Sequence, residues 1–268
     1  MQCAVCLEML YGDLAFDEKA RRAAEHGFRG FEFWGWRDKN LPDLSRVLSE
    51  TGSRITNFSG HRRGSPVSLE DQEVFLSDVV DAARTAVELR CPTLMILSNE
   101  LGEGGRVVDA FPHLPAGEKH ANMVHSLKRA LDVIPREITA VVEPLNTALD
   151  HPGNYLSGMA EAVNIVTEVG DPRLQVLADF YHLEMMGEPT QEVISRHGAS
   201  IGYVHIADVP GRHEPGTGTI DWKAALRALR DSGYDGTVGF EYEPAGNSDR
   251  SLEHIARLWK EALGTPVA

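Results

Sequence analysis

From Ile201 to Glu241 the chain reads IGYVHIADVPGRHEPGTGTIDWKAALRALRDSGYDGTVGFE, and this segment indicates the architecture of the whole protein. It opens with a β-rich run that reaches His205 and closes with another at Thr237–Glu241. Between the two lies a helical pattern, Trp222 to Asp231, which Asp221 precedes as an N-cap and a glycine follows. A strand, a helix and a further strand in this order predict a parallel βα unit.

The same alternation extends over the rest of the chain. We interpret eight short runs as strands: Cys3–Leu7, Gly30–Phe33, Arg54–Phe58, Thr93–Leu97, Thr139–Glu143, Gln175–Asp179, Gly202–Ile206 and Thr237–Glu241. No Pro/Gly-rich linker divides the 268 residues, a length that suits one barrel of about 250 residues. We therefore predict a single (β/α)8 TIM-barrel domain over residues 1–268. An open doubly wound sheet shows the same alternation and stays an alternative.

The charge balance narrows the range of partners. The chain has 26 basic and 40 acidic side chains, which gives a formal charge of −14. Binding to a nucleic-acid backbone needs clustered Lys and Arg, and anionic membranes repel an acidic surface. No apolar run approaches the ~20 residues that span a membrane, and no basic leader opens the chain. We therefore expect a soluble cytoplasmic protein that acts on a small molecule, with a homo-oligomer as an open alternative to a monomer.

The last four predicted strands end in side chains that can bind metal: Glu143, Asp179, His205 and Glu241. In a (β/α)8 barrel, the C-terminal strand ends form the active site. Asp, Glu and His make up roughly one residue in five, so chance gives four in succession only about once in several hundred trials. We therefore predict a metal site at this end of the barrel rather than four unrelated residues in contact with solvent.

Three carboxylates and one imidazole favour Mn²⁺, Mg²⁺ or Co²⁺, with Zn²⁺ as an alternative. A divalent metal on a carbonyl and its neighbouring hydroxyl would stabilise an enediolate. Glu143 and Glu241, on opposite walls, could then move a proton between adjacent carbons.

Residues close to these strand ends could contact a substrate. His182, three residues beyond Asp179, could hydrogen-bond a substrate oxygen or be an exposed loop histidine. Arg212 could pair with a substrate carboxylate or lie on the surface. Trp34 and Trp36 could wall the pocket or serve packing alone.

At these residues the chain resembles the xylose-isomerase-like barrel superfamily and, within it, the hydroxypyruvate isomerase family. The resemblance is strongest from Glu143 onward, and its most specific segment is the long one after the seventh strand. The matching segments are GFRGFEF (27–33), EPLN (143–146), DFYH (179–182), HIADVPGRHEPGTG (205–218) and GFEY (239–242).

The resemblance implies a metal held by Glu143, Asp179, His205 and Glu241, with the two glutamates doubling as acid/base groups. It also implies substrate contacts from His182 and Arg212. The reaction implied is an aldose–ketose-type isomerisation of carbohydrate metabolism, which interconverts hydroxypyruvate and tartronate semialdehyde through an enediol.

Several alternatives share this barrel. A ketose 3-epimerase would use the same metal and glutamates; those enzymes have His at the position of His205, where some hydroxypyruvate isomerases have Gln. Further alternatives are an isomerase of a four-carbon oxo acid and a subunit that cleaves carbon-linked glycosides with a partner chain. Apurinic-site endonucleases use several zinc ions and must bind DNA. The acidic charge of this chain disfavours DNA binding. A non-catalytic sugar-binding barrel would be expected to lack a ligand, and this sequence has all four candidate ligands.

Overall fold

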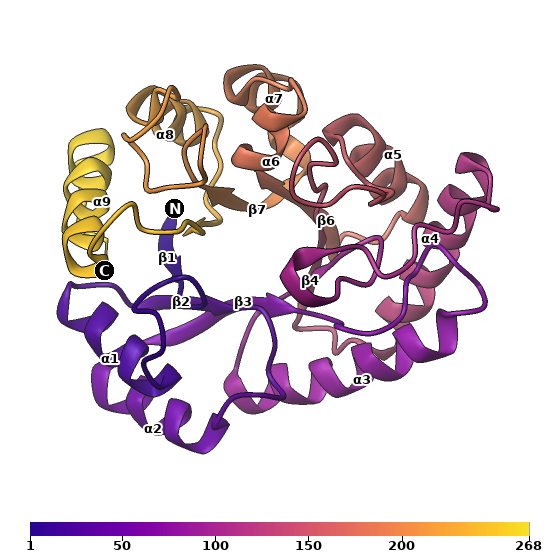
Figure 1. The fold of residues 1–268 in the computed structure, drawn as a ribbon, viewed down its shortest axis with the longest axis horizontal. Coiled ribbons are helices and arrows are strands. Elements are labelled where there is room, and N and C mark those ends of the chain that lie inside the picture. Colours follow the sequence, from indigo (N-terminus) through magenta and orange to yellow (C-terminus); the bar gives the residue numbers. More distant parts are fainter. Residues whose placement is uncertain (268) are drawn as a thin grey trace.

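The computed structural model describes residues 1–267 and contains a closed barrel of eight parallel strands. Each strand pairs with the next, and β1 pairs with β8, which excludes the open doubly wound alternative. Figure 1 shows the chain passing once around the ring. The strands are β1 (Gln2–Cys6), β2 (Gly30–Phe33), β3 (Arg54–Ser59), β4 (Thr93–Ile96), β5 (Thr139–Val142), β6 (Leu174–Asp179), β7 (Ile201–Ile206) and β8 (Thr237–Phe240).

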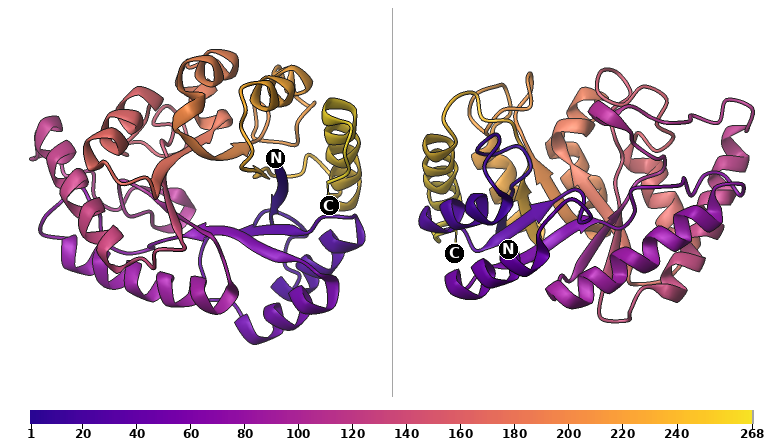
Figure 2. Two further views of the ribbon diagram at one scale, coloured as in Figure 1. Left: turned by 180° about the vertical axis from the view of Figure 1, so that it is seen from behind. Right: turned by 60° about the horizontal axis from the view of Figure 1, so that its bottom comes forward.

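Helices form the outer layer, as both views in Figure 2 show. Asn40 caps one helix with its side chain, and Gly52 ends that same helix in the left-handed conformation. Asp221 caps a second helix, and Gly170 ends a third in the left-handed conformation. The α-helices are α1 (Phe16–Glu25), α2 (Leu41–Thr51), α3 (Gln72–Leu89), α4 (Ala116–Val133), α5 (Met159–Val169), α6 (Phe180–Met185), α7 (Thr190–His197), α8 (Trp222–Asp231) and α9 (Ser248–Leu263), and the 3₁₀ turns are η1 (Glu103–Gly105) and η2 (Gly198–Ser200). Within residues 1–267, none of the helices is both long and apolar enough to cross a membrane.

Four strands, β1, β4, β5 and β8, end one residue earlier than predicted, and two of these ends adjoin site residues. β5 and β8 end just before Glu143 and Glu241. The amide of Glu143 still donates to the Ile96 carbonyl at 3.2 Å, and the amide of Glu241 donates to the Ile206 carbonyl at 3.2 Å. The two glutamates therefore extend the hydrogen-bond ladder by one bond at the point where the chain leaves the barrel.

Buried apolar side chains form two clusters. The larger one fills the space between the strands and the helices, and it includes Trp222 of α8 and Trp259 of α9. Three members of the smaller one, Val141, Leu177 and Tyr203, lie two residues before Glu143, Asp179 and His205 and so share the inward face of the barrel with them. This smaller cluster consists of Met95, Leu97, Val141, Leu145, Leu177 and Tyr203. Each buried side chain of this size stabilises the fold by about 1.5–3 kcal/mol, and together they form an apolar floor at the strand ends.

Candidate metal centre and active site

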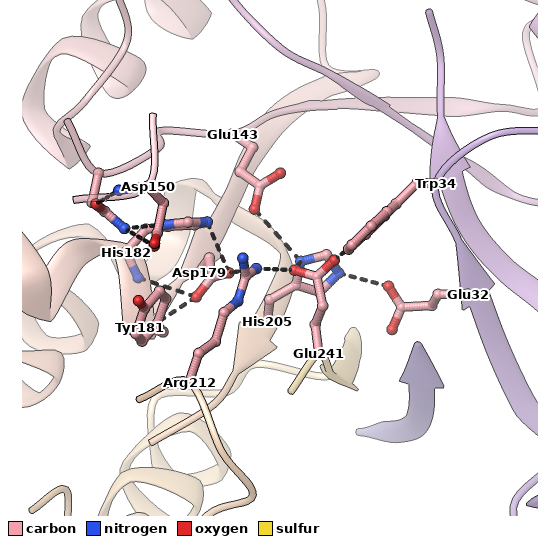
Figure 3. Close-up of polar contacts among 11 residues, drawn as sticks. Glu32, Trp34, Glu143, Asp150, Asp179, Tyr181, His182, His205, Arg212 and Glu241 are labelled. Carbon is pink, nitrogen blue, oxygen red and sulfur yellow. Dashed lines mark hydrogen bonds and ion pairs between the residues drawn. The ribbon is translucent and has the colours of Figure 1, made fainter. Parts of the chain in front are cut away.

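The four predicted ligand residues converge at the C-terminal mouth of the barrel. One ligand atom from each lies within 4.8 Å of the others, and all four side chains are buried. Figure 3 shows them pointing toward a common centre. Strand register explains part of this convergence, because Asp179 pairs with His205 across β6 and β7. The residues concerned are Glu143, Asp179, His205 and Glu241.

The unmet hydrogen-bonding capacity at this centre fits a divalent cation. His205 Nδ1 lies 3.3 Å from Glu241 Oε2 and 3.6 Å from Glu143 Oε1. Within residues 1–267, both His205 Nδ1 and Glu143 Oε1 are buried without a hydrogen-bond partner. A buried polar atom without a partner is costly, and a cation would satisfy several of these atoms together. Three carboxylates and one imidazole suit Mn²⁺, Mg²⁺ or Co²⁺, and they also accommodate Zn²⁺.

Asp179 serves the fold and the site with different oxygens. Its Oδ1 caps α6 by accepting hydrogen bonds from the amides of Tyr181 at 2.8 Å and His182 at 3.3 Å. Its Oδ2 faces the centre, 3.3 Å from an Arg212 nitrogen. The helix cap fixes the carboxylate and leaves its second oxygen directed at the centre.

The two glutamates have different electrostatic surroundings. Burial raises the pKa of Glu143 to about 7. Burial also acts to raise the pKa of Glu241, but the Arg212 guanidinium and His205 hold it well below its ordinary range. Two carboxylates with pKa values driven apart are typical of sites in which one group accepts a proton and another donates one.

His182 lies in the site, although not where the sequence placed it. We expected it in a loop; the structure places it in the short helix α6, buried, because Asp179 caps a helical turn there. Its Nδ1 accepts a hydrogen bond from Asn146 Nδ2 at 2.7 Å. Asn146 Oδ1 in turn accepts from the amides of Leu149 and Asp150, which fixes the orientation of the side-chain amide. His182 therefore carries its proton on Nε2, which lies 3.6 Å from Asp179 Oδ2.

Arg212 belongs to the site and is not a surface arginine. Its guanidinium contacts Glu241 Oε2 at 2.5 Å and stacks over the Tyr181 ring, with 5.1 Å between the guanidinium carbon and the ring centroid. Its Nε is buried without a hydrogen-bond partner in the described part of the chain. A free, buried guanidinium N–H at the centre suits a substrate carboxylate.

The loop that carries Arg212 depends on Asp208. This fully buried carboxylate accepts hydrogen bonds from the amides of Val209 at 2.9 Å and Gly216 at 2.7 Å. Gly218 lets the loop close, because a Cβ there would lie 2.2 Å from the Val209 carbonyl oxygen. Asp208 and Gly218, both in the long motif after β7, therefore fix the loop that positions Arg212.

The two tryptophans after β2 divide between the predicted roles. Trp34 lines the pocket and donates its indole N–H to Glu241 Oε1. Trp36 is buried and packs on Phe58, with 5.8 Å between the ring centroids. Trp34 therefore walls the site, and Trp36 serves packing.

A cavity of about 690 Å³ opens above the centre. The loops after β3 and β4 form its far wall, with Arg62 and the segment 101–105. Asp78 fixes the backbone at Arg62 by accepting from its amide at 2.6 Å and pairs with the Arg63 side chain at 2.8 Å. No ion pair involves the Arg62 side chain among residues 1–267. Sequence analysis assigned no role to Arg62, because the sequence does not show that the Asp78 side chain pairs with Arg37 and Arg63.

Residues 20–262 match the family described as xylose isomerase-like TIM barrel. The chain belongs to this family. Hydroxypyruvate isomerase of Escherichia coli K12 is 29% identical over 254 residues, covering 92% of this chain and 95% of the relative. The 2-oxo-tetronate isomerase of Pectobacterium atrosepticum is 25% identical and covers 93% of this chain and 94% of the relative.

A solved structure from Brucella melitensis, named AP endonuclease family 2, is 30% identical with a TM-score of 0.84; the match covers 96% of this chain and 98% of that one. The predicted fold and the predicted resemblance to hydroxypyruvate isomerases are thus confirmed, as is the prediction of an isomerase.

Proposed function

We propose that this protein is a metal-dependent isomerase that interconverts hydroxypyruvate and tartronate semialdehyde, or a closely related small hydroxy-oxo acid. The observation that carries the proposal is the buried cluster of three carboxylates and one imidazole beneath the pocket. Its relatives named as isomerases of hydroxypyruvate and 2-oxo-tetronate support the choice of substrate class.

The proposed metal ligands are Glu143, Asp179, His205 and Glu241. When bound, Mn²⁺, Mg²⁺, Co²⁺ or Zn²⁺ would supply Lewis-acid polarisation of adjacent carbonyl and hydroxyl oxygens. The protein supplies an apolar floor, two arginines in the pocket wall and a histidine that donates from Nε2.

We assign proton transfer to the two glutamates, Glu143 and Glu241. In hydroxypyruvate, one glutamate removes a proton from the hydroxymethyl carbon, and the electron pair forms an enediolate with the neighbouring carbonyl. The other glutamate then delivers a proton to the former carbonyl carbon, and a proton moves from the old hydroxyl oxygen to the new one. Glu143 and Glu241 come from β5 and β8, so they approach the substrate from different walls. His182 donates to a substrate oxygen, and Arg212 pairs with the carboxylate.

A four-carbon oxo acid is the second candidate. The cavity of about 690 Å³ is large for a three-carbon acid, and Arg62 stands in its far wall with a free guanidinium in the described part of the chain. A longer substrate would place additional hydroxyl groups between the metal centre and that wall. The 2-oxo-tetronate isomerase among the relatives supports this reading.

A substrate panel tests the proposal. The purified protein is stripped with EDTA, reloaded with each of the four metals and incubated with hydroxypyruvate, 2-oxo-tetronate, D-fructose and D-tagatose. We expect metal-dependent isomerisation of at least one acid and no epimerisation of the ketoses. Epimerisation of a ketose with both acids unchanged would contradict the proposal and favour a ketose 3-epimerase. The cytoplasmic location and the homo-oligomer stay predictions, which cell fractionation and light scattering measure.

A further inference from the structure

Glu32, on β2, is a buried carboxylate that contacts one of the proposed metal ligands. Its Oε2 lies 2.6 Å from His205 Nε2, and both side chains are 3% exposed. Figure 3 shows Glu32 on the side of His205 that faces away from Asp179. Among residues 1–267, His205 is the only side chain that hydrogen-bonds Glu32.

The position of this carboxylate costs stability. Its Oε1 is buried without a hydrogen-bond partner in the part of the chain that the structure describes. The nearby Tyr203 hydroxyl pairs with Thr56 at 2.8 Å and not with Glu32. Buried charges with so few partners are destabilising compared with apolar residues of similar size. A role at the site explains why this position holds a glutamate.

The backbone makes room for the pair. A Cβ at Gly239 on β8 would lie 1.9 Å from Glu32 Oε1 and 2.9 Å from His205 Cδ2. The pairing of β2 with β3 shifts register between Phe31 and Glu32, and such bulges redirect side chains next to active sites. Gly239 therefore leaves the space that the contact occupies, and the register shift falls at Glu32 itself.

We infer that Glu32 is a positioning residue, which holds His205 with its Nε2–H on the carboxylate and its Nδ1 directed at the metal position. This inference rests on the proposed metal centre. Nδ1 is the ring nitrogen that faces Glu241 Oε2 at 3.3 Å and Glu143 Oε1 at 3.6 Å. A carboxylate that accepts from the far nitrogen of a ligating histidine fixes the ring and strengthens the ligand.

Glu32→Gln is the first test, since it keeps the shape of the side chain and removes its charge. Mn²⁺ binding to metal-free protein is measured by titration calorimetry without substrate, and the visible spectrum of the Co²⁺-loaded protein reports ligand geometry. We expect about 10- to 100-fold weaker Mn²⁺ binding and a changed Co²⁺ spectrum. An Mn²⁺ affinity within twofold of wild type, with an unchanged Co²⁺ spectrum, would overturn the inference.

Gly239→Ala is an independent test that leaves both residues of the pair in place. Its methyl group displaces Glu32 or His205, so Mn²⁺ binding should weaken as in Glu32→Gln. Gly117→Ala on α4 is the control, because a Cβ there meets no atom within 4 Å. We expect this control to bind Mn²⁺ as wild type does. Wild-type affinity in Gly239→Ala, with thermal unfolding of the metal-free protein unchanged, would contradict the inference.

These measurements separate the inference from the proposed function. A wild-type protein that binds Mn²⁺ tightly but isomerises neither acid would contradict the function and leave the role of Glu32 intact. Tight binding by Glu32→Gln, with normal turnover in wild type, would contradict the role of Glu32 alone. A wild-type protein that binds none of the metals would contradict both.

Discussion

Replacing Asn146 with aspartate should reverse the hydrogen bond that orients His182. Asn146 is fully buried, and its Nδ2 donates to His182 Nδ1 at 2.7 Å. Its Oδ1 accepts from two backbone amides, a role that an aspartate oxygen can keep. The other aspartate oxygen, however, only accepts. The contact with His182 then survives only if Nδ1 carries a proton. Burial and the Arg212 guanidinium hold the pKa of His182 well below its ordinary range, so the ring stays neutral and Nε2 loses its proton.

The expected loss follows from the bond that His182 can no longer donate. A hydrogen bond to an oxygen that gains charge contributes about 1.5–3 kcal/mol. At 1.36 kcal/mol per factor of ten, this corresponds to an approximately 10- to 150-fold fall in kcat/KM. Loss of this bond in the transition state should appear in kcat more than in KM.

Asp150 requires a control of its own. Asn146 Nδ2 also donates to Asp150 Oδ2 at 2.7 Å, so Asn146→Asp places two carboxylates in contact. The double variant Asn146→Asp/Asp150→Asn removes that repulsion and keeps the reversed bond to His182. We expect it to remain impaired, whereas Asp150→Asn alone should stay within a few-fold of wild type.

Nitrogen-15 NMR of the His182 ring identifies the tautomer directly, and steady-state kinetics measure the change in kcat/KM. We expect the Nε2-protonated form in wild type and the Nδ1-protonated form in Asn146→Asp. An unchanged tautomer, or kcat/KM within threefold of wild type, would refute this reasoning.

The remaining predictions concern catalysis, specificity and stability. Glu143→Gln and Glu241→Gln should each lower kcat by about 10²- to 10⁴-fold in metal-saturated protein, and near-normal turnover in either would contradict a two-glutamate mechanism. Arg62→Ala should raise KM for an acid substrate about tenfold with kcat little changed, because the guanidinium binds ground state and transition state alike; an unchanged KM would remove Arg62 from the substrate site. His120, on α4, has its pKa raised by hydrogen bonds from its ring to Glu161 and Glu168, so the folded protein holds this proton more tightly than the unfolded chain. Its stabilising effect is therefore fully present below about pH 6.5 and is lost as the pH rises through the raised pKa. Urea unfolding of wild type and His120→Gln should show a difference of at most about 1 kcal/mol at pH 6 that shrinks by pH 9, and a difference that grows with pH would contradict the assignment.

Periodicity and strand-end chemistry predicted the barrel and its four converging side chains. They succeed because a parallel barrel places every strand end at one mouth, so a residue at a strand end is located without knowledge of its neighbours. Glu143, Asp179, His205 and Glu241 needed no tertiary information beyond this rule. Strand limits were less exact, since a single hydrogen bond decides whether Glu143 ends β5 or follows it.

Residues that act through a contact with another segment were missed. Glu32 and His205 are 173 positions apart, and only the closed barrel brings them together. Asn146 was part of a recognised motif, but its bond to His182 depends on the short helix that Asp179 caps. Asp78 pairs with Arg37 and Arg63, which leaves the Arg62 guanidinium without an ion pair among residues 1–267. Each of these roles depends on a contact between two residues from different segments, and a pattern of single residues along the chain does not show such contacts.

Isomerisation of hydroxypyruvate in D₂O by the metal-loaded protein tests the central claim most directly. Proton NMR over short times, with an enzyme-free sample as the control for spontaneous exchange, follows the carbon-bound hydrogens. Two glutamates that exchange with solvent predict tartronate semialdehyde with deuterium at the carbon that receives the proton. Product that carries at that carbon the hydrogen removed from the neighbouring carbon would contradict proton transfer by Glu143 and Glu241. The absence of product from both hydroxypyruvate and 2-oxo-tetronate with all four metals would contradict it as well.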